Sequence, residues 1–117
     1  VEGADIEKFG VVDGEKLKDG IYRVSNMVEK PKQADAPSNM AIIGRYILTP
    51  DIFDILEKTP PGKGGEIQLT DALLQQAQEG AVLAYRFKGT RCDCGSVEGF
   101  IEATNYVYEN LYHQPKN

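Results

Sequence analysis

Residues 40–48 form a nearly continuous apolar run of strand length, interrupted only by Gly44 and Arg45. A strand that is apolar on both faces is typical of the buried centre of a sheet, because other elements must cover both of its sides. The run therefore predicts a buried central strand.

Shorter strand candidates lie on either side of this run. Val11-Val12 and residues 21–24 are β-branched or apolar apart from Arg23, and the turn signals Asp13-Gly14 and Asp19-Gly20 separate them. This pattern predicts a small antiparallel meander or ribbon at the start of the chain. Residues 82–87 predict a further strand.

Two helices are predicted between these strands. Thr49-Pro50-Asp51 marks the first start, with Thr49 as N-cap, proline at the first helical position and an end near Lys58. The second helix runs from about Gln68 to Gln78, and Gly80 is a plausible stop. Its buried stripe is expected to contain Leu69, Leu73 and Ala77.

A third helix is predicted after Ser96, which is suited to cap it. The order of elements is a strand-rich start, then strand, helix, helix, strand, helix, which predicts an α/β or α+β fold in one unit, residues 1–117. We interpret the following residues of the third helix, which recur at helical spacing, as core: Val97, Phe100, Ile101, Thr104, Tyr108 and Leu111.

The charge and composition exclude several classes of protein. Lys and Arg number 13 against 18 Asp and Glu, and this net charge of −5 argues against a nucleic-acid surface. No apolar run approaches membrane-spanning length and no targeting pattern is recognisable, so we expect a cytoplasmic protein. Cys92 and Cys94 are the two cysteines, and we expect both to be reduced and without a metal.

The segment Val28-Glu29-Lys30-Pro31 places a carboxylate next to an ammonium group. Within a strand these side chains point to opposite faces, but at a strand end they can converge on one ligand. Glu29 could then accept hydrogen bonds from hydroxyl groups, and Lys30 could bind a phosphate. This chemistry suits a phosphorylated sugar.

Several motifs in order resemble the second half of bacterial UTP–glucose-1-phosphate uridylyltransferases. The resemblance covers most of the chain, from about Phe9 to about Asn110. The motifs that carry it are Phe9-Gly10-Val11-Val12, Val28-Glu29-Lys30-Pro31, residues 38–46, residues 60–72 and Asp93-Cys94-Gly95.

The resemblance implies part of a Rossmann-like nucleotidyltransferase domain, an α/β fold with a mixed sheet and flanking helices. It also implies an enzyme that condenses UTP with glucose 1-phosphate to give UDP-glucose and pyrophosphate. In that family the sugar phosphate attacks the α-phosphorus of UTP directly. The resemblance therefore implies that no protein nucleophile is needed and that Mg²⁺ neutralises oxygen charge.

Carried over position by position, the resemblance gives roles to individual residues. Gly10 would bring its backbone close to the sugar, and Glu29 would accept hydrogen bonds from its hydroxyls. Lys30 would neutralise the sugar phosphate as the catalytic cation, and Asp93 would be one of two carboxylates that hold Mg²⁺. Thr70-Asp71 would have supporting roles.

Structural interpretations of the same residues remain open. Gly10 could be only a turn residue, Asp93 could brace the start of the following helix, and Asp71 could complement its own helix dipole. The glycines of residues 62–65 lack the spacing of a phosphate-binding loop.

The glycine-rich nucleotide loop of the family has no match in the sequence. We therefore expect the C-terminal half of a nucleotidyltransferase domain, without its nucleotide-binding half. We expect this half to be inactive alone, and either to associate with another copy or to be marginally stable by itself. Two alternatives remain open. One is a thymidylyltransferase or other hexose-1-phosphate nucleotidyltransferase, and the other is a non-catalytic sugar-phosphate-binding or oligomerisation module.

Overall fold

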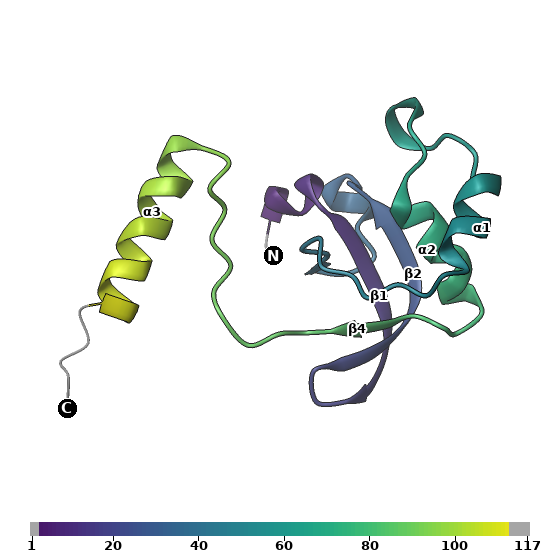
Figure 1. Ribbon diagram of the computed structural model, residues 1–117, viewed down its shortest axis with the longest axis horizontal. Helices are drawn as coiled ribbons and strands as arrows, with labels where there is room; N and C mark the ends of the chain where they lie inside the picture. Colours follow the sequence, from purple (N-terminus) through teal and green to yellow (C-terminus); the bar gives the residue numbers. More distant parts are fainter. Residues whose placement is uncertain (1–2, 113–117) are drawn as a thin grey trace. The chain divides into compact units, whose positions relative to one another are not determined.

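The chain forms two compact units, Val1–Arg86 and Phe87–Asn117, each described below by itself. The computed structural model describes residues 3–112 (Figure 1). Within that range, no helix is both long enough and apolar enough to cross a membrane.

The first unit is built on a four-stranded antiparallel sheet with strand order β3-β1-β2-β4. Strands β1 (Gly10–Lys18) and β2 (Ile21–Glu29) form a long hairpin, which is the centre of the sheet (Figure 1). The edges are β3 (Met40–Ala41) beside β1 and β4 (Leu83–Tyr85) beside β2. The predicted combination of helices and a sheet is confirmed.

One of the two predicted turns closes the hairpin. Asp19-Gly20 connects β1 to β2, and Gly20 adopts a φ of 74° that glycine tolerates best. Asp13-Gly14, which we predicted as a turn, instead lies inside β1 at a shift in the strand register. A Cβ atom on Gly14 would lie 2.0 Å from the carbonyl oxygen of Arg23. The lack of a side chain at Gly14 therefore allows the backbones of β1 and β2 to approach closely here.

The prediction of a buried central strand over residues 40–48 is wrong. Only Met40–Ala41 pairs, at the edge of the sheet, and Ile47 is fully exposed. Gly44 adopts a φ of 76°, which turns the backbone out of the extended conformation shortly after β3. The apolar, β-branched residues of this run do favour an extended strand, but a strand forms only where a neighbouring strand supplies hydrogen bonds.

The first helix of the unit, α1 (Ile52–Lys58), ends where predicted but begins later. Thr49 is not the N-cap of this helix. It belongs to a turn before the helix, in which the Ile52 amide donates a 3.1 Å hydrogen bond to the Thr49 carbonyl. The Thr49 side chain instead accepts a 3.4 Å hydrogen bond from Gln76, and Asp51 accepts one of 2.7 Å from the same amide group.

Helix α2 (Leu69–Gln78) is confirmed within one residue of its predicted start. Gly80 ends it as predicted, with a φ of 74° and a hydrogen bond from its amide to the Ala77 carbonyl at 2.9 Å. The helix packs on β2 and beside α1 (Figure 1). The core between them comprises Val12, Val24, Met27, Ile52, Ala72, Leu73 and Ala77.

Short 3₁₀ turns connect these elements at Gly3–Lys8, Gln33–Asp35 and Lys63–Gly65. The last of these turns lies in the loop between α1 and α2 and belongs to the site described below.

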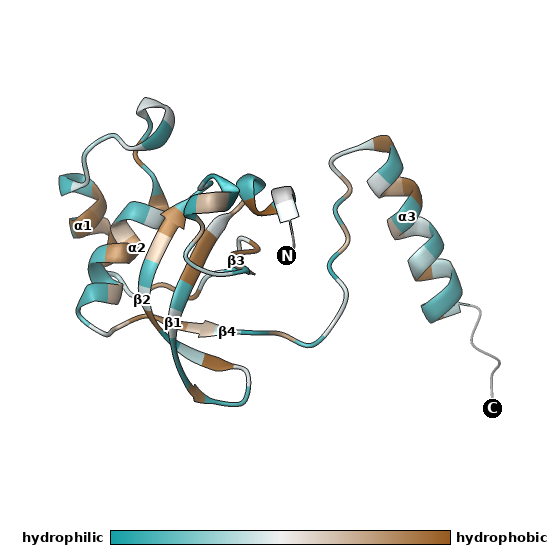
Figure 2. Ribbon diagram, turned by 180° about the vertical axis from the view of Figure 1, so that it is seen from behind, coloured by the Kyte–Doolittle hydropathy of each residue, from teal (hydrophilic) through white to brown (hydrophobic). Residues whose placement is uncertain are grey.

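The second unit contains α3 (Val97–Val107) followed by a π-helical turn, Tyr108–Tyr112. The Ser96 cap is confirmed, since its hydroxyl accepts a 3.0 Å hydrogen bond from the Gly99 amide. The predicted core role of the apolar stripe is wrong, because Ala103 is the only buried residue of α3 and Val97 is 72% exposed. Bands of apolar and polar residues alternate along the helix in Figure 2, and within residues 87–112 no other helix or strand covers the apolar ones.

Candidate functional site

Gly10 and Glu29 face each other at the open end of the β1–β2 hairpin. They are the last paired residues of the two strands, at the end opposite to the turn. A Cβ atom on Gly10 would lie 2.9 Å from the Glu29 Oε2 atom and 3.0 Å from the Ile42 side chain. The absence of a side chain at Gly10 therefore leaves room for the Glu29 carboxylate.

Thr70 completes this group from the first turn of α2. Its hydroxyl donates a 2.6 Å hydrogen bond to Glu29 Oε2, and the residue is only 4% exposed. The sequence suggested only a supporting role for Thr70. The sequence places Thr70 near the start of a predicted helix, but no local sequence signal indicates which strand that helix packs against.

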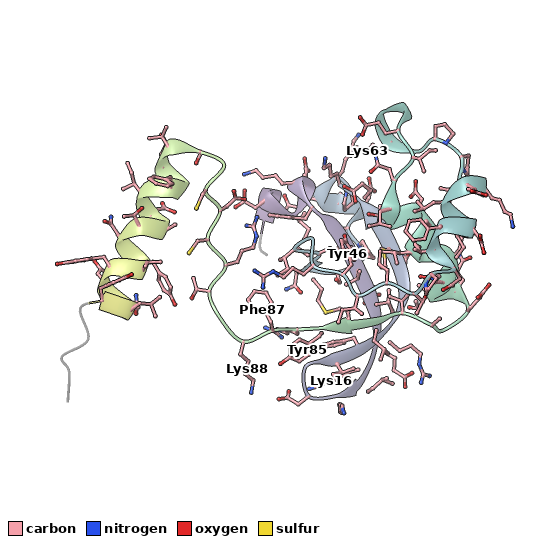
Figure 3. The ribbon with its side chains drawn as sticks, viewed as in Figure 1. Lys16, Tyr46, Lys63, Tyr85, Phe87 and Lys88 are labelled. Atoms are coloured by element: carbon pink, nitrogen blue, oxygen red, sulfur yellow. The ribbon has the colours of Figure 1, made fainter. Side chains whose placement is uncertain are left out.

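Tyr46 adds a neighbour that the sequence analysis missed. Burial raises the pKa of the Tyr46 phenol above its ordinary value of 10.0, and the negative charge of Glu29 raises this pKa further. Like any tyrosine phenol at neutral pH, this one is protonated and can donate a hydrogen bond. Figure 3 labels Tyr46 in the segment after β3.

Lys30, directly after β2, is exposed and has a positive φ of 44°. Its amide donates a 3.0 Å hydrogen bond to the Phe9 carbonyl, so its backbone stays tied to the residue before Gly10. Its own carbonyl accepts a hydrogen bond from the ammonium group of Lys63, which Figure 3 labels in the loop before α2. The positive φ of Lys30 interrupts the regular alternation of side chains between the two faces of the sheet. The side chain of Lys30 is therefore not constrained to the face opposite Glu29.

The loop that carries Lys63 is held by its own hydrogen bonds. The Gly62 amide donates to the Glu66 carbonyl at 2.8 Å, and the Gln68 side chain donates to the Lys63 carbonyl at 2.9 Å. A Cβ atom on Gly62 would lie 2.2 Å from an oxygen of Asp71. Asp71 thus lies against the loop backbone, which is a supporting position.

Asp93 belongs to the second unit. Its Oδ2 atom accepts a 2.7 Å hydrogen bond from Arg91, and its Oδ1 atom accepts one of 3.0 Å from the Gly95 amide. A Cβ atom on Gly99 would lie 2.0 Å from the Asp93 carbonyl oxygen, so α3 begins in close contact with this residue. Asp93 therefore does brace the start of the helix, while its side chain remains 58% exposed.

A pocket of about 380 Å³ lies in this unit between α3 and the segment before it. Cys92, one of its lining residues, is a free and exposed thiol, as is Cys94. The lining residues are Thr90, Arg91, Cys92, Asp93, Gly99, Glu102, Ala103 and Tyr106.

The carboxylate of Asp93 suits a hard divalent cation. Mg²⁺ binds oxygen ligands and commonly takes only one or two carboxylates, with water and substrate phosphates completing its shell. Among the described residues, no group of three or more His, Cys, Asp or Glu side chains is placed to hold a metal.

Comparison with known proteins identifies the family of the chain. The model of the nucleotidyl transferase family matches residues 1–110. The chain belongs to the nucleotidyl transferase family. Members of this family generally use a divalent metal.

Relatives of the chain confirm the resemblance drawn from its motifs. Two proteins from Pseudomonas aeruginosa named UTP–glucose-1-phosphate uridylyltransferase are 68% and 61% identical, over 96% and 99% of the chain. The chain spans 40% and 42% of their lengths. A crystal structure of UDP-glucose pyrophosphorylase complexed with UDP-glucose is 60% identical, with a TM-score of 0.84, and the match covers 91% of this chain and 40% of that one.

Proposed function

We propose that the protein carrying this chain condenses UTP with glucose 1-phosphate to give UDP-glucose and pyrophosphate. In this proposal the chain supplies the sugar-phosphate part of the site. The observation that carries it is the convergence of Gly10, Glu29 and Thr70 at one end of the hairpin, with Lys30 next to them. The names of the relatives supply the identity of the substrates.

Each residue of this group has a separate task in the proposed reaction. The Glu29 carboxylate accepts hydrogen bonds from sugar hydroxyls, and Gly10 leaves room for the sugar ring to approach the backbone. The Lys30 ammonium group binds the sugar phosphate and lowers the repulsion between two anionic substrates.

The reaction itself is a direct displacement at phosphorus. An oxygen of the sugar phosphate forms a bond to the α-phosphorus of UTP, and the bond to the pyrophosphate leaving group breaks. Such a transfer depends on positioning and on charge stabilisation rather than on a protein nucleophile. Lys30 contributes to both by holding the attacking phosphate.

We also propose Asp93 as a ligand of Mg²⁺. The bound cation would neutralise charge on phosphate oxygens. The side chain of Asp93 is 58% exposed, and hydrogen bonds from Arg91 and from the Gly95 amide hold it in one orientation. Asp93→Asn should lower the affinity for Mg²⁺, measured by titrating the metal in the activity assay of the full-length protein. An unchanged Mg²⁺ dependence would remove Asp93 from the metal site.

We further propose that the chain associates with another copy. Phe100 and Leu111 are 60% and 70% exposed, and the edge strand β3 pairs on one side only within the described residues. Exposed apolar side chains and strand edges favour association. Light scattering during size-exclusion chromatography should give a mass above that of one chain, and a monodisperse, heat-stable monomer would contradict this proposal.

The main test of the function measures pyrophosphate release from UTP and glucose 1-phosphate by the full-length protein. We expect UDP-glucose as the product, less activity with dTTP, and a loss of at least about 100-fold in kcat/KM for Glu29→Gln and for Lys30→Met. Glu15→Gln is the matched control, because Glu15 is an exposed residue of β1 far from the open end of the hairpin.

Two outcomes would contradict the proposal. A full-length protein that makes no UDP-glucose would overturn the reaction, and a Glu29→Gln variant as active as Glu15→Gln would overturn the site. The 117-residue chain by itself should release no pyrophosphate above background. Amide chemical shifts during titration with glucose 1-phosphate would report whether this chain alone binds the sugar phosphate.

A further inference from the structure

We infer that Thr70 is a positioning residue that fixes the orientation of the Glu29 carboxylate and thereby sets selectivity among sugar hydroxyls. The inference rests on the proposed function, because it concerns the same sugar site. Thr70 itself acts through Glu29 and needs no contact with the substrate.

The hydroxyl of Thr70 is used differently from those of two other threonines at helices. Thr59 and Thr104 both donate to the backbone carbonyl four residues earlier, each at 2.8 Å. This local bond is the usual one for threonine in or at the end of a helix. Thr70 donates instead to Glu29, which is 41 residues earlier in the sequence, at 2.6 Å.

Both partners of this bond have little freedom to move. Thr70 is 4% exposed, and its β-branched side chain has few rotamers in a helix. Glu29 ends a strand whose neighbour is Gly10, with the position of a Gly10 Cβ atom 2.9 Å from Oε2 and 3.5 Å from the Thr70 hydroxyl. Oε2 is thus enclosed between the Thr70 hydroxyl and the backbone of β1.

The other carboxylate oxygen of Glu29 accepts no hydrogen bond from a described residue. With Oε2 held by Thr70, rotation of the carboxylate is restricted and Oε1 is the oxygen available to a sugar hydroxyl. An acceptor in a fixed direction distinguishes a hydroxyl in the right place from a missing one far better than a rotating carboxylate does.

The experiment compares Thr70→Val, which keeps the shape but removes the hydroxyl, with Thr70→Ser, which keeps the hydroxyl. In the full-length protein, Thr70→Val should raise KM for glucose 1-phosphate about 10-fold or more, since it removes a hydrogen bond to a charged group. KM for UTP should change less than about twofold, and Thr70→Ser should stay within about threefold of wild type. Thr70→Ala provides a second hydroxyl-free variant if the valine variant does not fold.

Selectivity is the readout that a purely structural role would not change. The wild type is assayed with glucose 1-phosphate and with its 2-, 3-, 4- and 6-deoxy analogues, and the analogue that loses most activity identifies the hydroxyl bound by Glu29. Discrimination against that analogue should fall about 10-fold in Thr70→Val and persist in Thr70→Ser. In a Glu29→Gln background, Thr70→Val should have little further effect on KM for the sugar phosphate, because the two residues act as a unit.

The outcomes separate this inference from the proposed function. An active wild type whose Thr70→Val variant keeps its KM and its selectivity would overturn the role of Thr70 alone. Equal increases in both KM values, or no rescue by serine, would also overturn it, because they indicate a general loss of structure. A wild type that makes no UDP-glucose would overturn the proposed function and this inference with it.

Discussion

The ammonium group of Lys63 donates a hydrogen bond to the backbone carbonyl of Lys30, the one non-glycine residue with a positive φ within residues 3–112. A residue with a Cβ atom in this conformation costs about 1–2 kcal/mol. The chain holds Lys30 there by contacts on both sides, from Lys63 and to the Phe9 carbonyl. This strain lies next to Glu29, where the proposed site needs the lysine side chain.

Replacing Lys30 should therefore separate stability from binding. Lys30→Gly relieves the backbone strain, whereas Lys30→Ala keeps it, so the glycine variant should have the higher free energy of unfolding by about 1 kcal/mol. Both variants lose the ammonium group and should bind glucose 1-phosphate equally weakly. Chemical denaturation of the chain measures the difference, and equal stabilities would mean that the positive φ is not kept in solution.

Gly10 and Gly14 offer a matched pair of alanine substitutions in one strand. At Gly10 the new methyl group would meet the ends of two side chains, Glu29 and Ile42, which can move. Gly10→Ala should therefore cost less than about 1 kcal/mol of stability but displace the carboxylate and weaken sugar-phosphate binding. At Gly14 the methyl group would meet the backbone of Arg23, so Gly14→Ala should cost about 2 kcal/mol or more.

Thermal melts and amide shift titrations with glucose 1-phosphate test this contrast. A Gly10→Ala variant that binds as well as the wild type would remove Gly10 from the site. A Gly14→Ala variant of unchanged stability would show that the strand register adapts at no cost.

The raised pKa of Tyr46 predicts a loss of stability at alkaline pH. Burial favours the neutral phenol and the charge of Glu29 adds to this effect, so the folded state keeps the Tyr46 proton at a pH where the unfolded state releases it. Stability should therefore fall as the pH rises from about 10 through the folded pKa. Denaturation of wild type and Tyr46→Phe between pH 9 and 11 measures this fall, because the variant lacks the contribution of Tyr46.

The Glu29→Gln variant tests the contribution of the Glu29 charge to the raised pKa of Tyr46. It removes the neighbouring charge but not the burial, so the alkaline loss should shrink without disappearing. If wild type and Tyr46→Phe have the same pH dependence, Tyr46 does not lie in this environment in solution.

The Ser96 cap should contribute to the stability of α3. Ser96→Ala removes the hydroxyl that accepts the Gly99 amide, which should cost about 1 kcal/mol of helix stability. Ser96→Asp keeps an acceptor at this position and should preserve the helix. Amide exchange rates across Val97–Val107 measure the effect, and equal rates in the alanine and aspartate variants would contradict the capping role.

Features with local causes could be predicted from the sequence. The Asp19-Gly20 turn, the end of α2 at Gly80 and the Ser96 cap each depend on the conformation of neighbouring residues. The resemblance assigned Gly10 and Glu29 separately to the sugar, and the hairpin register places the two residues opposite each other.

Features that depend on distant partners could not be predicted. The apolar run around Ile47 has the composition of a central strand, but nothing in its letters tells whether a neighbouring strand pairs with it. The stripe of α3 likewise has the spacing of a core helix without a described element of its unit to cover it. The bond from Thr70 to Glu29 joins residues 41 positions apart, so it required the packing of α2 on β2.

The hairpin register also sets the order in which this group of residues can assemble during synthesis. Gly10 and Glu29 meet when one local hairpin closes, an event of about 1–10 μs. Thr70 is synthesised 41 residues after Glu29, a delay of seconds at a rate of about 5–20 residues per second. The hairpin can therefore bring the carboxylate into place before Thr70 has been synthesised to fix its orientation.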